Sequence, residues 1–189
     1  MLYSERYRIE SLRLKGYDYT APGAYFVTIC ADSRIERFGK IEDGNMRRNQ
    51  IGEVAHQTWI GIPNHHQNAT LDEFIVMPNH VHGIIVLGVH SGDVACNVAN
   101  VTNISTRDPS SLMAQISPKR GSLGSIIRSY KSAVTNRCHA LGHDDVLWQS
   151  RFHDHIIRNK KELNAIRAYI RNNPANWDKD RNHSAEVSF

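Results

Sequence analysis

The sequence predicts an α+β fold of the ferredoxin-like kind, a sandwich in which helices pack on one face of an antiparallel sheet. Short runs that alternate β-branched or aromatic residues with others indicate strands, and longer runs with apolar residues at helical spacing indicate amphipathic helices. Turn residues between neighbouring strands favour antiparallel pairing. The expected order is strand, strand, helix, strand, strand, loop, helix, strand, helix, with no internal repeat.

The size and composition of the chain suit one globular domain. Its 189 residues are 40% hydrophobic and 22% charged, with a net charge of +4 at pH 7. This excess of Lys and Arg favours a polyanionic partner, because cations gain affinity by displacing counterions from phosphates. The three cysteines form no CxxC pair, which argues against a disulfide framework and a zinc knuckle. Without an apolar leader or a run of about 20 apolar residues, we expect a cytoplasmic protein.

The chain divides into three expected parts. Residues 1–22 form a basic N-terminal arm, residues 23–177 form the single domain, and residues 178–189 form a C-terminal tail. Within the domain, residues 90–120 are rich in Ser, Asn and Thr and lack periodicity, so we expect a long loop or insertion there.

The first half of the domain is expected to hold strands around one helix. Residues 23–32 alternate as a strand does, and Asp43-Gly44 is typical of a hairpin turn. Residues 49–61 show helical spacing of apolar side chains, and Pro63 is expected to end that helix.

The second half continues with two strands, a helix, a strand and a last helix. The strands at 70–77 and 80–89 are separated by a Met-Pro-Asn turn. The helix at 122–141 can be capped by Ser122 and ended by Gly142. A short strand follows within 146–158, and the last helix spans 159–174, from a capping Asn159 to Pro174.

Two histidines lie one residue apart in an apolar strand that reads EFIVMPNHVHGIIVL over residues 73–87. His80 and His82 point to the same face of the strand, about 7 Å apart, and could bind one metal ion between them. The alternative is that one histidine is satisfied in the core and the other is exposed. A metal site would need a further ligand, and an amide oxygen from a facing helix would suit Mg²⁺ or Mn²⁺.

The last predicted helix carries a tyrosine and an asparagine on one face. Tyr169 borders its apolar stripe and Asn173 follows four residues later. Both could meet the same ion, although a phenol needs a base or a positive charge to act as a nucleophile. The alternative is that Tyr169 is an ordinary rim residue and Asn173 an ordinary helix end. Tyr130 is a rival nucleophile whose apolar neighbours favour a core role, and His153 with His155 forms a second histidine pair that nothing nearby completes.

Three segments in order, VMPNHVHGIIVL, IIRSYKSAVTN and LWQSRFHDHIIRNKKELNAIRAYIRNNPANW, resemble the single-tyrosine HUH transposases, in particular the REP-associated tyrosine transposases. The similarity runs from about residue 23 to residue 177. It implies a ferredoxin-like fold in which His80 and His82 bind Mg²⁺ or Mn²⁺ and Tyr169 is the nucleophile. It also implies that Asn173 completes the metal shell. Insertion-sequence relatives carry the longer Gln there, so the helix would have to sit closer.

The resemblance also implies the reaction and the partners. The substrate would be single-stranded DNA folded into a hairpin at palindromic repeat ends, cleaved and rejoined through a 5′-phosphotyrosine link with release of a 3′-OH. The family includes dimers as well as monomers, so a homodimer stays open. An unpaired base could stack on Trp148 or Phe152, although a core role suits Trp148 equally. Basic residues expected to grip the DNA backbone are Lys119, Arg120, Arg128, Lys131, Arg137, Arg158, Lys160 and Lys161.

Two other functions stay open on the sequence. One is a catalytically silent protein that binds nucleic-acid hairpins on the same fold. The other is a two-histidine hydrolase of small phosphoesters. Formation of a covalent protein–DNA adduct distinguishes the transposase from both.

Overall fold

The computed structural model describes residues 17–88, 118–144, 148–180 and 182–183. Most of the expected arm, most of the expected 90–120 loop and the end of the expected tail lie outside these residues. Among the described helices, none is long and apolar enough to cross a membrane.

Four strands form one antiparallel sheet in the order β4-β5-β1-β6. Helices connect β1 to β4 and β5 to β6, so the order and connections are those of a ferredoxin-like unit. The predicted fold class is therefore confirmed. The strands are β1 (Gly23–Cys30), β4 (Ala69–Val76), β5 (His80–Leu87) and β6 (His153–Ile157).

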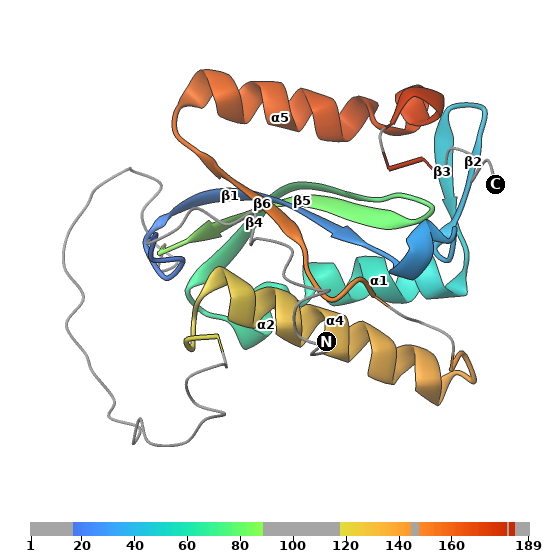
Figure 1. The fold of residues 1–189 in the computed structure, drawn as a ribbon, viewed down its shortest axis with the longest axis horizontal. Coiled ribbons are helices and arrows are strands. Elements are labelled where there is room, and N and C mark those ends of the chain that lie inside the picture. The colour runs from blue at the N-terminus through green and yellow to red at the C-terminus, as the bar shows by residue number, and fades with distance from the viewer. Residues whose placement is uncertain (1–16, 89–117, 145–147, 181, 184–189) are drawn as a thin grey trace, which may run out of the picture.

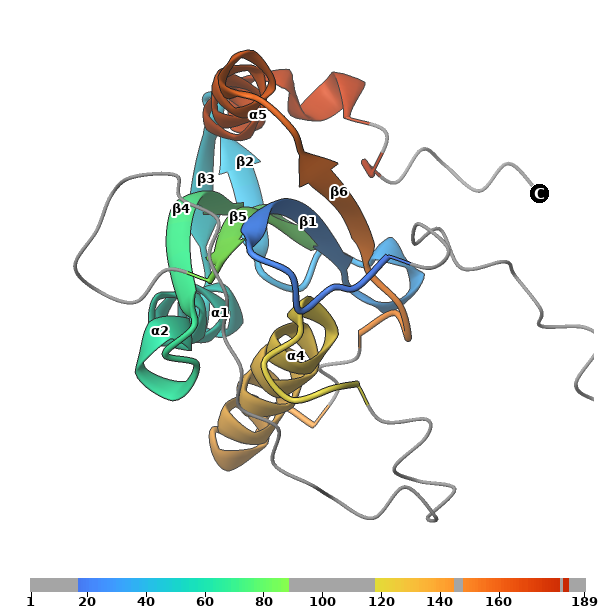
Figure 2. The same ribbon diagram turned by 90° about the vertical axis from the view of Figure 1, so that its left-hand side faces the viewer.

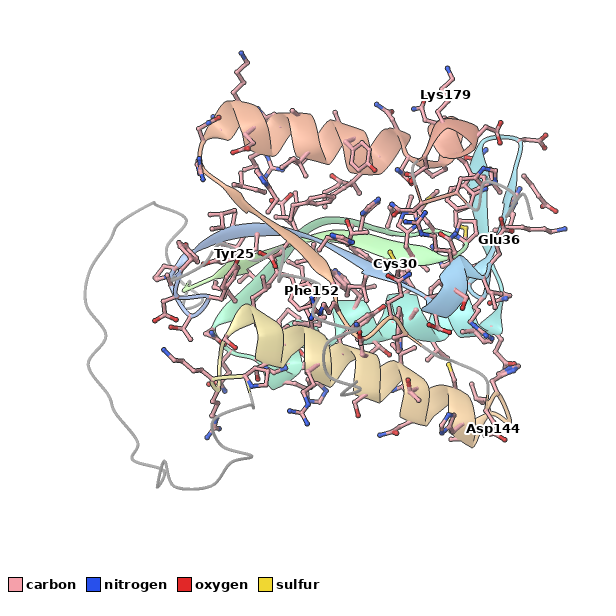
Figure 3. All side chains as sticks on the ribbon, in the orientation of Figure 1. Tyr25, Cys30, Glu36, Asp144, Phe152 and Lys179 are labelled. Carbon is pink, nitrogen blue, oxygen red and sulfur yellow. The ribbon has the colours of Figure 1, made fainter. Side chains whose placement is uncertain are left out.

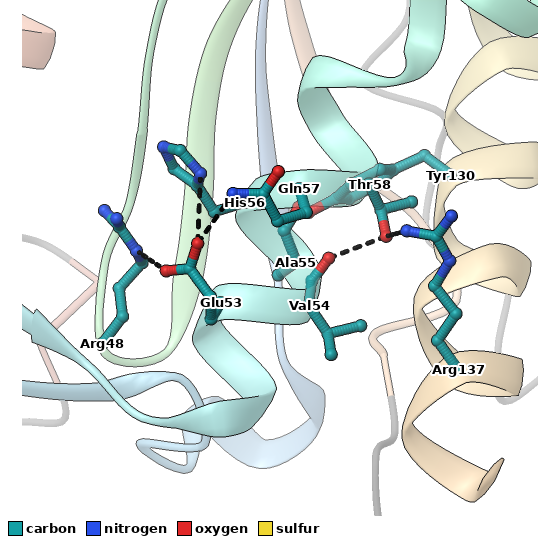
Figure 4. Close-up of polar contacts among 9 residues, drawn as sticks. All are labelled: Arg48, Glu53, Val54, Ala55, His56, Gln57, Thr58, Tyr130 and Arg137. Carbon is teal, nitrogen blue, oxygen red and sulfur yellow. Dashed lines mark hydrogen bonds and ion pairs between the residues drawn. The ribbon is translucent and has the colours of Figure 1, made fainter. Parts of the chain in front are cut away.

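One face of the sheet packs against α1 (Gln50–Ile60) and α4 (Leu123–Ala140), as Figure 1 shows. Alternate residues of β1 point into this core, and Tyr25, Val27 and Ile29 are fully buried. The helices contribute the expected apolar stripes, including Ala55, Trp59, Ile126, Ile127, Tyr130 and Val134. Two polar contacts add to this packing in Figure 4: the Arg137 guanidinium donates to Thr58 Oγ1 at 3.2 Å, and Thr58 donates to the Val54 carbonyl oxygen at 2.7 Å.

The helix ends largely follow the expected signals. Ser122 Oγ accepts a hydrogen bond from the Ser125 N–H at the start of α4, and Gly142 takes φ +83° just after its end. The expectation that Pro63 ends the helix at 49–61 is wrong in detail. The chain turns at Gly61 and continues as the short helix α2 (Ile62–His65), because proline is tolerated in a first helical turn.

The expected hairpin is present as β2 (Gly39–Glu42) and β3 (Asn45–Arg48). Both turn residues have positive φ, 50° at Asp43 and 70° at Gly44, as a tight two-residue hairpin turn requires. A single turn of 3₁₀ helix, η1 (Asp32–Arg34), precedes the hairpin.

The last helix does not lie with the other two. Figures 1 and 2 show α5 (Lys160–Asn172) across the opposite face of the sheet, followed by the 3₁₀ helix η2 (Pro174–Lys179). The expectation of helices on one face therefore holds for α1 and α4 only. The physical reason is that the second face is also apolar in part. Ile84 of β5 and Ile170 of α5 are both fully buried there.

Two ion pairs fasten α5 to the edge strand β4. Arg167 Nε lies 2.7 Å from Asp72 Oδ1, and Arg171 Nη1 lies 2.7 Å from Glu73 Oε2. The pairing of β4 with β5 shifts register between Leu71 and Phe74, so the two consecutive acidic residues lie at an irregularity of the strand. Both can then reach arginines on the same helix.

A candidate metal and tyrosine site

The two histidines of β5 lie on the face of the sheet that α5 covers. His80 pairs with Cys30 and His82 with Thr28 across the β1–β5 ladder, and both imidazoles are fully buried. Their ring centroids are 4.3 Å apart. The expected alternative, with one histidine buried in the core and the other exposed, does not describe them.

Each histidine has one ring nitrogen engaged by a neighbouring side chain. Thr28 Oγ1 lies 2.9 Å from His82 Nδ1, and Asn79 Oδ1 lies 2.8 Å from His80 Nδ1. Partners of this kind orient metal-binding imidazoles, because a ring whose Nδ1 carries the hydrogen and donates it to an acceptor has its lone pair on Nε2.

Tyr169 brings its hydroxyl to these rings from the last turns of α5. Its Oη lies 3.2 Å from His82 Nε2, and its ring meets Phe26 edge to face with centroids 6.1 Å apart. The side chain remains 40% exposed. The predicted convergence of the phenol on the histidine pair is therefore present within a single chain, with one side of the phenol open to solvent.

Asp180, which the sequence analysis did not single out, completes a group of three metal-ligating side chains. One ligand atom from each of His80, His82 and Asp180 lies within 4.8 Å of the other two. Tyr169 Oη donates to Asp180 Oδ2 at 3.3 Å. The residue lies in the segment expected to be a loose tail, where no periodic pattern marked it. Trp177, three residues earlier, is 6% exposed and stacks on His80, and a tryptophan at that place is the kind of sequence signal that could have indicated a packed segment.

Asn173, the predicted third ligand, lies beside this group. Its Nδ2 donates to Asp180 Oδ2 at 2.6 Å. Its Oδ1 is buried and has no hydrogen-bond partner among the described residues. A buried carbonyl oxygen without a donor is costly unless a further group, such as a cation, completes it.

The carboxylate of Asp180 is held in its charged form. Burial raises its pKa, but this is outweighed by hydrogen bonds from the Asn182 N–H and the Asn173 amide, with smaller contributions from the nearby His80 and the Tyr169 hydroxyl. The pKa therefore lies below its ordinary value, and the group is an anion at neutral pH.

These donors fit a divalent cation. Two imidazoles, a carboxylate and an amide oxygen are a mixed nitrogen and oxygen set of the kind that Mn²⁺ accepts. A cation bound between these groups would be stabilised by the buried Asn173 Oδ1, which has no hydrogen-bond partner among the described residues, and by the negative charge of Asp180.

A pocket of about 640 Å³ opens beside the tyrosine. Its lining is amide-rich, with Asn172, Asn173 and Asn176 joining Tyr169, Lys179 and Asp180. Figure 3 shows the labelled Lys179 side chain extending away from the sheet. The pocket therefore places asparagine amides and the Lys179 ammonium group next to the partly exposed Tyr169 phenol.

The predicted DNA-binding residues fall into two groups. Lys119, Arg120, Arg128, Lys131 and Arg137 lie on or just before α4, across the sheet from the histidines. Arg158, Lys160 and Lys161 lie at the start of α5, the end away from Tyr169, and are exposed.

Three of these basic side chains already have partners in the protein. Lys119 Nζ lies 3.8 Å from Asp18 Oδ2 in an exposed ion pair. Lys131 Nζ donates to the carbonyl oxygens of Gln149 and Arg151 at 2.7 and 3.0 Å, and burial lowers its pKa to about 8. Arg137 donates to Thr58, as described above.

The other sequence candidates lie outside the site. Tyr130 is 2% exposed and donates to the Ala55 carbonyl oxygen at 3.2 Å, in keeping with the core role that was favoured for it. His155 Nε2 lies 2.6 Å from Glu162 Oε1. Trp148 packs on Phe38, with ring centroids 5.2 Å apart, and Phe152 packs against the core.

Fold and site together give a ferredoxin-like sheet that carries a His-x-His group, with an aspartate and a tyrosine beside it. The fold is similar to that of a REP-associated tyrosine transposase solved bound to a REP hairpin, with a TM-score of 0.54 and 19% identity over 87% of this chain and 74% of that one. A candidate transposase from Deinococcus radiodurans R1 gives a TM-score of 0.45 and 14% identity over 85% of this chain and 95% of that one.

The family is shown by a sequence relative. The chain is 36% identical over 174 residues to an uncharacterised protein of Haemophilus influenzae strain Rd, covering 90% of this chain and 91% of that protein. It belongs to the same family as that protein. No established family model matches the chain.

Proposed function

We propose that this chain is a metal-dependent single-stranded DNA endonuclease and strand transferase, a REP-associated tyrosine transposase that uses Tyr169 as its nucleophile. The observation that supports this most strongly is the position of one hydroxyl. Tyr169 Oη lies 3.2 Å from His82 Nε2 and 3.3 Å from Asp180 Oδ2 in the same chain. No second subunit is needed to bring a nucleophile, two imidazoles and a carboxylate together.

In the proposed reaction Tyr169 Oη attacks the phosphorus of a phosphodiester. The Oη–P bond forms, the bond from phosphorus to the 3′-oxygen breaks, and the leaving oxygen takes a proton from water to become a 3′-OH. The phenol proton passes to a solvent water on the open side of Tyr169, because the lowered pKa of Asp180 makes that carboxylate a poor base. Asp180 instead orients the hydroxyl by accepting its hydrogen bond. The new 5′-phosphotyrosine ester keeps the bond energy, so that another 3′-OH can reverse the step and join strands.

His80, His82 and Asp180, with Asn173 Oδ1, would hold the divalent ion, Mg²⁺ or Mn²⁺. When bound, the ion would polarise the scissile phosphate and offset its developing charge. Other residues of this chain hold these groups in position. Thr28 and Asn79 orient the imidazoles, and Phe26 supports the Tyr169 ring.

The proposed substrate is hairpin DNA from palindromic repeat ends. A solved REP-associated tyrosine transposase of similar fold is bound to a REP hairpin. The pocket beside Tyr169, with three asparagine amides and Lys179 in its lining, has polar groups suited to the strand next to the cleavage point. The exposed Arg158, Lys160 and Lys161 are proposed to contact the backbone of the hairpin.

The test is covalent capture of DNA. The chain is incubated with Mn²⁺ and a fluorescent single-stranded hairpin, and adducts are counted on a denaturing gel. We expect an adduct in wild type and in Tyr17→Phe, which removes a phenol that bonds only within the protein, to Tyr25 at 3.2 Å. We expect none in Tyr169→Phe. Hairpin binding without any wild-type adduct would instead support the silent hairpin-binding protein, and hydrolysis of small diesters without an adduct would support the hydrolase.

A further inference from the structure

The side chain of Asn79 lies between the histidine strand and the C-terminal segment. It is 1% exposed and uses its whole amide. Its Nδ2 donates to the carbonyl oxygens of Asn182 at 2.8 Å and Arg34 at 3.0 Å, and its Oδ1 lies 2.8 Å from His80 Nδ1. Three segments distant in sequence therefore meet at one amide group.

These contacts determine which way the amide points. A backbone carbonyl oxygen can only accept a hydrogen bond, so two of them require the NH₂ group on their side. Oδ1 must then face His80, and because this oxygen can only accept, His80 Nδ1 must carry the hydrogen. The lone pair of the neutral imidazole is left on Nε2, the nitrogen that a metal would bind.

The same amide also acts on Asp180. The Asn182 N–H donates to Asp180 Oδ1 at 2.6 Å, while the Asn182 carbonyl oxygen accepts from Asn79. A continuous path of hydrogen bonds therefore runs from His80 through Asn79 and Asn182 to Asp180. Trp177, three residues before Asp180, stacks on the same His80 ring with centroids 5.9 Å apart.

We propose that Asn79 is a positioning residue for the metal site. It fixes His80 in the Nδ1–H tautomer, and through Asn182 it holds the segment that carries Asp180 in register with the histidine strand. This inference rests on the metal site of the proposed function, but it assigns a role to a residue outside the ligand set. A merely structural amide would not determine the tautomer of His80 or the affinity for a metal.

The first measurement is the tautomer of His80 in the metal-free protein. ¹⁵N-labelled histidine and long-range ¹H–¹⁵N NMR at pH 8 distinguish the Nδ1–H from the Nε2–H form. We expect the Nδ1–H form in wild type. Finding the Nε2–H form overturns the inference, and this result does not depend on any variant being able to fold.

The second measurement is the binding of Mn²⁺ alone by titration calorimetry. Asn79→Ala removes all three hydrogen bonds and is expected to weaken binding by about 10–100-fold. Asn79→Asp keeps an oxygen for His80 Nδ1 but loses the donors to Asn182 and Arg34. It is expected to keep the His80 tautomer and still bind Mn²⁺ more weakly than wild type.

The matched control is Asn68→Ala. Asn68 Nδ2 donates to the Gly121 carbonyl oxygen at 2.8 Å, near the opposite end of β5 from His80. The Asn68→Ala substitution should lower thermal stability without changing the affinity for Mn²⁺. If wild type binds Mn²⁺ and Asn79→Ala binds it as tightly, this inference alone fails. If wild type binds no Mn²⁺, the proposed metal site is refuted, and this inference, which depends on that site, is refuted as well.

Discussion

Gly83, which directly follows His82, is predicted to be the least replaceable small residue of the sheet. A Cβ added there would lie 2.2 Å from Trp59 Cζ2 and 2.9 Å from Cε2 and Cη2. The indole is fully buried, and it stacks on Phe74 and meets Tyr130 edge to face. Gly83→Ala therefore overpacks the core next to the histidine pair.

The cost of this substitution follows from the overlap. Overpacking a filled core costs about 1–3 kcal/mol, and in a chain of this length each kcal/mol lowers the melting temperature by about 2–4 °C. We expect Gly83→Ala to lower the melting temperature by about 2–12 °C in a calorimetric or circular-dichroism melt, taking the product of these two ranges.

Two further variants make the test specific. Trp59→Phe removes the outer indole atoms Cζ2 and Cη2, including the one that a Cβ would meet most closely, so the double variant should be less destabilised than the sum of the two single variants. Gly61→Ala is the control, because its Cβ would meet only Gln57 O and Thr58 O at an ordinary 3.5 Å. A Gly83→Ala protein that melts like wild type, or a strictly additive double variant, would refute the packing argument.

Two other predictions concern the site and the attachment of α5. Thr28→Val leaves the buried His82 Nδ1 without its hydroxyl partner and should reduce Mn²⁺ affinity by about 10–100-fold, while Thr28→Ser, which keeps the hydroxyl, should bind Mn²⁺ nearly as wild type does in the same calorimetric titration. Hydrogen bonds from Arg167 hold the pKa of Asp72 below its ordinary value, so the stability that this carboxylate contributes is present above pH 4 and is lost as the pH falls through its lowered folded-state pKa. Asp72→Asn should therefore be less stable than wild type by about 1 kcal/mol at pH 7, with the difference shrinking below about pH 4. A difference that is constant with pH in urea unfolding would contradict this assignment.

The sequence predicted the parts of the fold that depend on local patterns. The alternation around His80 and His82 identified a strand whose histidines share a face, and helical spacing identified the helix that carries Tyr169. Both patterns arise from side-chain periodicity, which the backbone geometry of strands and helices imposes directly. The proximity of Tyr169 to His82 followed from the family resemblance and is present in the fold.

The rest depends on tertiary contacts that no local pattern encodes. An apolar stripe shows that α5 must pack, but not which face of the sheet it covers. Asp180 lies in a short irregular segment, and its place in the site depends on Trp177 stacking on His80 and on the hydrogen bond from Asn182. The hydrogen bonds of Lys131 and Arg137 within the protein could not be predicted either, because their partners are backbone or side-chain groups from other elements.

The most direct test of the account is to map where DNA becomes attached. The chain is incubated with Mn²⁺ and a single-stranded hairpin labelled at its 3′ end or its 5′ end, digested with trypsin and analysed by mass spectrometry. The account predicts that only the 3′-labelled fragment is transferred to protein, and that the modified peptide carries its nucleotide on Tyr169. Transfer of the 5′-labelled fragment, attachment to any other residue, or no adduct from a protein that binds both Mn²⁺ and the hairpin would contradict it.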